Sequence, residues 1–157
     1  IIVEIDECYL VKRKYHRGRL VNEIWILGAY DIDNKIGFVV PVERRDSTTL
    51  LSFILRFVRP GSIIVTDCWA GYDTLGLYGY HHFRVNHSTN FVAPDSGYTT
   101  NHIESCWQKL KQYHKNRYGT HRSKLYGHLG VYMWRQRFKK SFKHFLMHIK
   151  EIYSLNN

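Results

Sequence analysis

The sequence predicts a mixed α/β fold in which helices flank a mixed β-sheet. Short β-branched runs fill the first forty residues, as in strands. Apolar residues recur at helical spacing from residue 47 onward. A continuous apolar run at 62–66 that ends in an acid is typical of a buried central strand. With 157 residues, 44% of them hydrophobic, the chain has the size of one ordinary domain with a real core. We therefore expect residues 1–157 to form a single domain.

Three strands are expected first, at 1–6, 23–30 and 36–42. Turn residues at 31–35 join the last two, so the three strands form an antiparallel meander. Alternation in the first strand places Glu4 and Asp6 on one face and Val3 and Ile5 on the other.

A helix follows, capped by Asp46 and ended by Pro60-Gly61. The buried strand comes next at 62–67, and after it a loop-rich stretch with a short strand at 82–85. Helical patterns then cover 100–118 and the chain from Ser123 onward. The order is βββαβ(β)αα.

The last segment, 138–157, is expected to be a helical extension with an aromatic and aliphatic stripe. The stripe consists of Phe138, Phe142, Phe145, Leu146, Ile149, Ile152 and Tyr153. We expect it to pack on the domain, with dimerisation as the alternative.

The chain is strongly basic, with 23 Lys and Arg against 13 Asp and Glu and a formal net charge of +10. Such an excess attracts polyanions, nucleic acid first among them. No apolar run reaches the ~18–20 residues that span a bilayer, so no membrane partner is expected. Three widely separated Cys indicate a reducing, intracellular compartment. The missing initiator methionine suggests a fragment of a longer protein.

Three acids lie at the ends of predicted elements: Asp6, Asp67 and Glu104. A carboxylate at the end of a buried strand is costly unless it is paired or bound to metal. Hard oxygen ligands suit Mg²⁺ or Mn²⁺, and two such ions catalyse phosphoryl transfer. Ordinary alternatives exist, because both Asp side chains could cap turns and Asn101 with Glu104 matches a capping box.

The chain resembles the DDE transposase domain of the ISXO2-like insertion sequences and their eukaryotic Merlin relatives. The resemblance covers about residues 1–137 and rests on five motifs in order. These are 3–7 with the basic 12–19, Ile64 to Tyr72, 85–92, 94–97, and Thr100 to Trp107 with 109–111.

The resemblance implies an RNase H-like, retroviral-integrase-like fold with Asp6, Asp67 and Glu104 as the catalytic, metal-binding triad. It implies metal-dependent DNA cleavage and strand transfer with two Mg²⁺ or Mn²⁺ ions. It also implies that Lys111 contacts DNA, and that Asn101 is an accessory candidate or substitute third ligand. The family's N-terminal end-recognition region is expected to lie outside this chain.

Further DNA contacts are expected from a basic arm and from the helix after residue 100. The DNA-binding candidates are Lys12, Arg13, Lys14, Arg17, Arg19, Lys111 and Lys115, and His87 is a second accessory candidate. The expected partners are transposon ends and target DNA, with a homo-oligomer on DNA. The compartment would be the nucleus in a eukaryote and the nucleoid or cytoplasm in a bacterium.

Two other functions stay open on the sequence. One is a domesticated, non-catalytic DNA-binding or scaffold protein, and the other is a different RNase H-like nuclease.

Overall fold

A five-stranded sheet forms the centre of the protein in a computed structural model, which describes residues 1–10, 24–86, 97–117, 120–139 and 141–153. Its strands are β1 (Ile2–Tyr9), β2 (Trp25–Asp31), β3 (Ile36–Val42), β4 (Ile63–Thr66) and β5 (His81–Arg84). Their order in the sheet is β3-β2-β1-β4-β5. The expected mixed sheet is thus confirmed, with three antiparallel strands followed by parallel ones.

Strand β1 lies at the centre of this sheet and pairs differently on its two sides. It is antiparallel to β2 over its whole length, from Val3 opposite Asp31 to Tyr9 opposite Trp25. It is parallel to β4 over a shorter stretch that ends with Glu4 opposite Val65. The strand therefore runs three residues past Asp6, and the prediction that Asp6 ends it is wrong, because the pairing with β2 continues.

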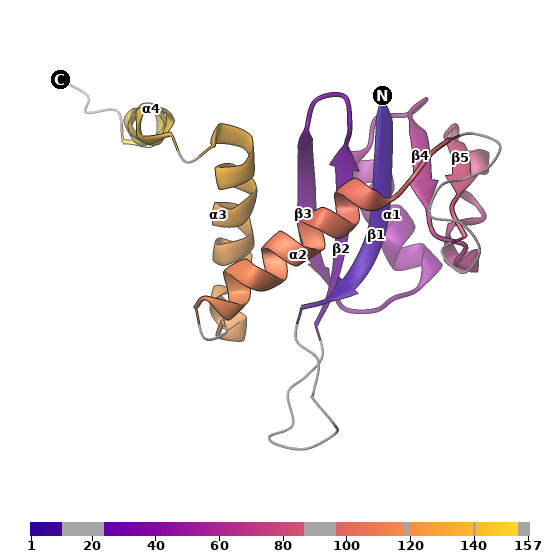
Figure 1. The fold of residues 1–157 in the computed structure, drawn as a ribbon, viewed down its shortest axis with the longest axis horizontal. Coiled ribbons are helices and arrows are strands. Elements are labelled where there is room, and N and C mark those ends of the chain that lie inside the picture. The colour runs from indigo at the N-terminus through magenta and orange to yellow at the C-terminus, as the bar shows by residue number, and fades with distance from the viewer. Residues whose placement is uncertain (11–23, 87–96, 118–119, 140, 154–157) are drawn as a thin grey trace, which may run out of the picture.

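Helices cover both faces of the sheet. Figure 1 shows α2 (Asn101–Lys115) lying across one face and α1 (Ser47–Phe57) behind the other. Helix α3 (Leu125–Phe138) stands beside β3, and α4 (Phe142–Ile152) lies at its far end. Short 3₁₀ segments complete the fold: η1 (Ala70–Tyr72), η2 (Leu75–Tyr78) and η3 (Arg122–Lys124). The Asp46 carboxylate caps α1 as expected, accepting the Thr49 N–H at 2.8 Å.

The alternation of β1 divides the core in two. Val3 and Ile5 are buried with Leu50 and Ile54 of α1. On the opposite face, a second cluster joins the sheet to α2 and α3. Its buried members are Cys8, Leu10, Ile26, Val39, Ile103, Cys106, Trp107, Leu110, Leu125, Leu129 and Tyr132. The predicted assignment of Glu4 and Asp6 to one face is confirmed by their contacts with α2, described below.

The C-terminal stripe does not pack on the sheet, and its packing on the rest of the domain is a contact with α3. The helix breaks at Lys139, whose φ of 50° ends α3, and Ser141 caps a new helix. Phe142 and Ile152 of α4 remain 69% and 74% exposed. Helix α4 instead contacts α3, where the Trp134 ring meets Phe145 and His148. Within the described part of the chain, no helix is long and apolar enough to cross a membrane.

Candidate active site

Asp6 lies on β1, and Asp67 lies at the end of the neighbouring parallel strand β4. Asp67 directly follows β4, and Asp6 lies two residues beyond the last β1–β4 pair. Continuing the same register places Asp6 opposite Asp67. The sheet thus brings two acids that are far apart in the sequence to one edge, where the two strands diverge.

The third acid, Glu104, lies in the first turn of α2, and Glu4 fixes the start of that helix. Glu4 is completely buried. Its Oε2 accepts the backbone N–H of Ile103 at 2.8 Å, and its Oε1 lies 2.7 Å from Nδ1 of His102. A carboxylate satisfying the free N–H groups at a helix N-terminus stabilises the helix there.

The capping box suggested by the sequence is not present. Helix α2 begins at Asn101, so Thr100 is the N-cap and Asn101 is already helical. The Thr100 hydroxyl donates to Oε1 of Glu104 at 3.4 Å. Glu104 therefore lies one position further into the helix than a capping box requires.

The other two acids also accept hydrogen bonds from nearby donors. Asp6 Oδ2 accepts the indole N–H of Trp107 at 2.8 Å. Asp67 Oδ1 accepts the backbone N–H of Trp69 at 3.0 Å. Asp67 therefore caps the turn that follows it, as the alternative interpretation of the sequence expected. Only its Oδ1 atom takes part in this hydrogen bond.

Electrostatics link the three acids. Burial raises the pKa of Asp6, the hydrogen bond from Trp107 opposes the rise, and the charges of Asp67 and Glu104 add to it. Asp67 and Glu104 are thus both close enough to Asp6 for their charges to act on its carboxyl group. A site with converging carboxylates holds its negative charge at a cost that a bound cation would relieve.

The donor chemistry of the three acids fits Mg²⁺ or Mn²⁺, because both ions prefer carboxylate oxygens. The geometry is less complete. Among the residues that the structure describes, no group of three or more His, Cys, Asp or Glu side chains is arranged to hold a metal ion.

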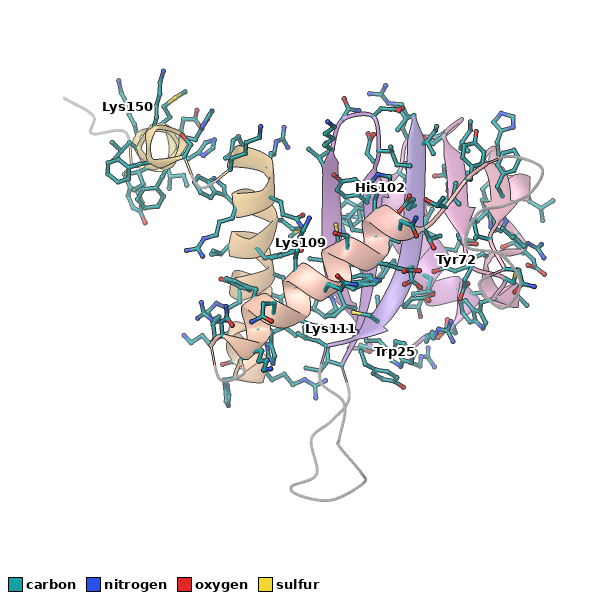
Figure 2. All side chains as sticks on the ribbon, in the orientation of Figure 1. Trp25, Tyr72, His102, Lys109, Lys111 and Lys150 are labelled. Carbon is teal, nitrogen blue, oxygen red and sulfur yellow. The ribbon has the colours of Figure 1, made fainter. Side chains whose placement is uncertain are left out.

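A cavity of about 560 Å³ lies beside Asp6. Asp6 and Lys111 both line it, together with the aromatic rings of Tyr9, Trp25 and Trp107. Figure 2 shows Lys111 extending from α2 toward the end of β1 near Trp25. The cavity thus brings a cation and an acid together among aromatic rings.

Glu7 forms a second buried acidic site on the opposite face of β1. The Tyr72 hydroxyl donates to Glu7 Oε1 at 2.5 Å, and the Arg45 guanidinium lies 3.4 Å from Oε2. Burial raises the pKa of Glu7, while Tyr72 and Arg45 oppose the rise. Arg45 also covers the Trp69 ring, 4.4 Å from its centroid. This network thereby ties β1 to the loop that carries Asp67.

Sequence reasoning overlooked Glu4, Glu7 and Trp107 as contributors to the site. For Glu4 a signal existed, because an acid flanked by Val3 and Ile5 in a strand needs a buried partner. Trp107 fell in the apolar sector of its helix, which concealed its polar role. Glu7 had no comparable signal, since Arg45 and Tyr72 are distant in the sequence.

The structure describes some of the remaining candidates. Asn101, Lys111 and Lys115 are exposed on α2. The basic arm candidates and His87 lie outside the described residues. All three cysteines are described and free, with Cys8 and Cys106 buried and Cys68 exposed.

Solved structures show what kind of fold this is. The chain resembles a chain of the simian T-cell lymphotropic virus intasome in complex with the PP2A regulatory subunit B56 gamma, with a TM-score of 0.58 and 17% identity. The match covers 85% of this chain and 47% of that one. A match to the HTLV-2 integrase catalytic core domain with magnesium has a TM-score of 0.38 and 16% identity, over 69% and 82% of the two chains, too low to support an inference. The fold is RNase H-like, of the retroviral integrase type, as expected.

The family follows from the sequence match. Residues 2–140 match the model of the ISXO2-like transposase domain, and the chain belongs to that family. An uncharacterized transposase-like protein of Haemophilus influenzae is 40% identical over 76 residues. That alignment covers 48% of this chain and 60% of the relative's length.

Proposed function

We propose that this chain is the catalytic core of a DNA transposase, which cleaves DNA strands and joins them to a target with divalent metal ions. Asp6, Asp67 and Glu104 are the proposed metal ligands and catalytic residues. The observation that supports the proposal is the position of Asp6 on β1, where the charges of Asp67 and Glu104 both act on its carboxyl group and where it lines a cavity.

Two Mg²⁺ or Mn²⁺ ions would supply an activated oxygen nucleophile and stabilise the leaving oxygen of the phosphodiester. The protein's own part is to hold three carboxylates at the divergence of β1 and β4. Glu4 keeps α2, and with it Glu104, in place over the sheet. The network of Glu7, Tyr72 and Arg45 holds the Asp67 loop from the other side.

Lys111 and Lys115 are proposed to bind the DNA backbone. They lie four residues apart on α2, so they share one side of the helix, and both are exposed. Lys111 also lines the cavity that contains Asp6. A phosphate bound by Lys111 would therefore lie near the proposed metal ligands. The basic arm, Lys12 to Arg19, is proposed to extend this DNA contact, and assembly of copies on DNA belongs to the same proposal.

The test measures nicking and strand transfer on labelled DNA carrying the element's ends, with MnCl₂ or MgCl₂ present. Asp6→Asn, Asp67→Asn and Glu104→Gln should each lower the rate by about a hundredfold or more, because each removes charge from the reacting site. Glu151→Gln, on α4, is the matched control and should cut DNA like the parent chain. An Asp67→Asn variant that still cuts would disprove the assignment.

DNA binding is measured separately, by fluorescence anisotropy over a range of salt concentrations. The three acid variants should bind DNA as the parent does. Lys111→Ala and Lys115→Ala should weaken binding on every sequence, each lowering the salt slope by about one. DNA binding without cutting under any metal would indicate the non-catalytic scaffold. Cutting of RNA–DNA hybrids or junctions without strand transfer would indicate another nuclease.

A further inference from the structure

Gly28 leaves a space directly opposite Asp6. The two residues are paired across the antiparallel β1–β2 ladder. A side chain at position 28 would collide with α2: its Cβ would lie 2.8 Å from Cζ2 of Trp107 and 3.1 Å from Cδ1 of Ile103. The Trp107 ring thus fills the volume that any other residue at position 28 would occupy.

The same ring makes the hydrogen bond to Asp6. Trp107 is 5% exposed, and its indole N–H donates to Asp6 Oδ2 at 2.8 Å. A buried indole N–H needs an acceptor. Here the acceptor is one oxygen of a proposed metal ligand, and a donor with this geometry restricts how that carboxylate can rotate.

We propose that Trp107 is a positioning residue that orients the Asp6 carboxylate for divalent metal binding, and that Gly28 provides the space this requires. This inference rests on the proposed function. The proposed role depends on the indole N–H of Trp107, which packing against the sheet would not require. Side chains that hydrogen-bond to a metal ligand, without touching the metal, hold that ligand in the orientation the ion requires.

The surroundings of Trp107 support an orienting role. The helix that carries it is held at its start by Glu4, which belongs to the same face of β1 as Asp6. Ile103 and Leu110, one turn to either side, are each 1% exposed. Trp107 on α2 and Asp6 on β1 therefore belong to elements that are held in place relative to each other. The hydrogen bond between them can hold the Asp6 carboxylate in one orientation.

The first test measures Mn²⁺ binding to the full chain by isothermal titration calorimetry with MnCl₂. Trp107→Phe keeps an aromatic ring but removes the N–H together with part of the indole's bulk, and Gly28→Ala displaces the ring. Each should weaken Mn²⁺ binding by about 10- to 100-fold, the range found when a residue that holds a metal ligand in place is removed. Trp134→Phe and Gly130→Ala are matched controls on α3. Trp134 bonds to His148, and a Cβ at Gly130 would have no neighbour within 4 Å, so both should bind as the parent does.

The second test uses the parent chain alone, so it does not depend on the folding of a variant. The indole N–H of Trp107 is followed by NMR while MgCl₂ is added. If Trp107 orients a metal ligand, its resonance should shift and reach a plateau along the binding curve that calorimetry with MgCl₂ reports. The Trp134 resonance should stay constant. A folding defect in Trp107→Phe would appear in thermal unfolding and would leave this result valid.

The outcomes separate the two proposals. Loss of Mn²⁺ binding in Asp6→Asn, with parent-like binding in Trp107→Phe and Gly28→Ala, would overturn the positioning role and leave the metal site standing. A Trp107 resonance unmoved by saturating MgCl₂ would overturn it as well. A parent chain that binds neither Mn²⁺ nor Mg²⁺, with or without DNA, would contradict the proposed function, and the positioning role with it.

Discussion

Helices α2 and α4 are both amphipathic, yet the protein uses them very differently. Helix α2 buries Ile103, Trp107 and Leu110 against the sheet and donates two hydrogen bonds to acids of β1. Helix α4 leaves Phe142 and Ile152 largely exposed and contacts α3 through Trp134. An apolar stripe therefore predicts that a helix forms. Specific polar partners on a neighbouring element decide where it is held.

The largest expected effect follows from removing the acid that holds α2. Glu4→Ala should lower the free energy of unfolding by about 3 kcal/mol, because the N–H of Ile103 loses its buried acceptor. Glu4→Gln keeps an acceptor and should lose less. Urea denaturation measures both. A loss below about 0.5 kcal/mol for Glu4→Ala would show that apolar packing alone positions α2.

A smaller loss is expected on the opposite face of β1. Tyr72→Phe deletes the hydroxyl that donates to Glu7 and leaves that buried carboxylate with Arg45. We expect about 1.5 kcal/mol of destabilisation in the same urea experiment. Tyr78→Phe, at an exposed position, is the control and should change nothing. Equal stability of the two variants would contradict a structural role for the Glu7 network.

A modest pH effect is expected at β5, next to the strand that leads to Asp67. Burial lowers the pKa of His82, and the charge of Arg84 lowers it further while Asp73 opposes this. The unfolded chain therefore binds a proton at this site more readily, and stability should fall as the pH decreases below 6.5. His82→Gln should flatten that part of the pH profile, measured by thermal unfolding. An unchanged profile would show that other groups account for it.

The smallest effect is expected at α4. Phe142→Ser and Ile152→Ser should each change stability by less than about 0.5 kcal/mol, because the side chains are already exposed. Thermal unfolding over a range of protein concentrations checks this. A large loss, or a concentration-dependent one, would show that the face is covered in solution and would remove the contrast with α2.

The sequence predicted the order of elements along the chain from their residue patterns, and it predicted the shared face of Glu4 and Asp6 from local alternation. It also predicted that Asp6, Asp67 and Glu104 belong together, although that came from a family resemblance. It did not predict the bonds that hold them. Trp107 reaches Asp6 only because Gly28 lies across the ladder, a relation between three distant positions. Periodicity in one helix contains no such information.

The break between α3 and α4 was not predicted either, for a different reason. Phe138 to Tyr153 reads as one continuous apolar stripe, but Lys139 adopts a left-handed conformation and Ser141 begins a new helix. A left-handed lysine carries no strong sequence signal, since glycine is the usual residue there. One residue thus changed the direction of the last helix.

The parallel pairing of β1 with β4 also has a kinetic consequence. The contact of residue 4 with residue 65 closes a loop of about sixty residues, an entropic cost that must be met before the pairing contributes stability. The β1–β2–β3 meander can form earlier, since residues 10–24 and 32–35 are much shorter connections. We therefore expect Asp6 and Asp67 to meet late on the folding pathway, when the sheet is nearly complete.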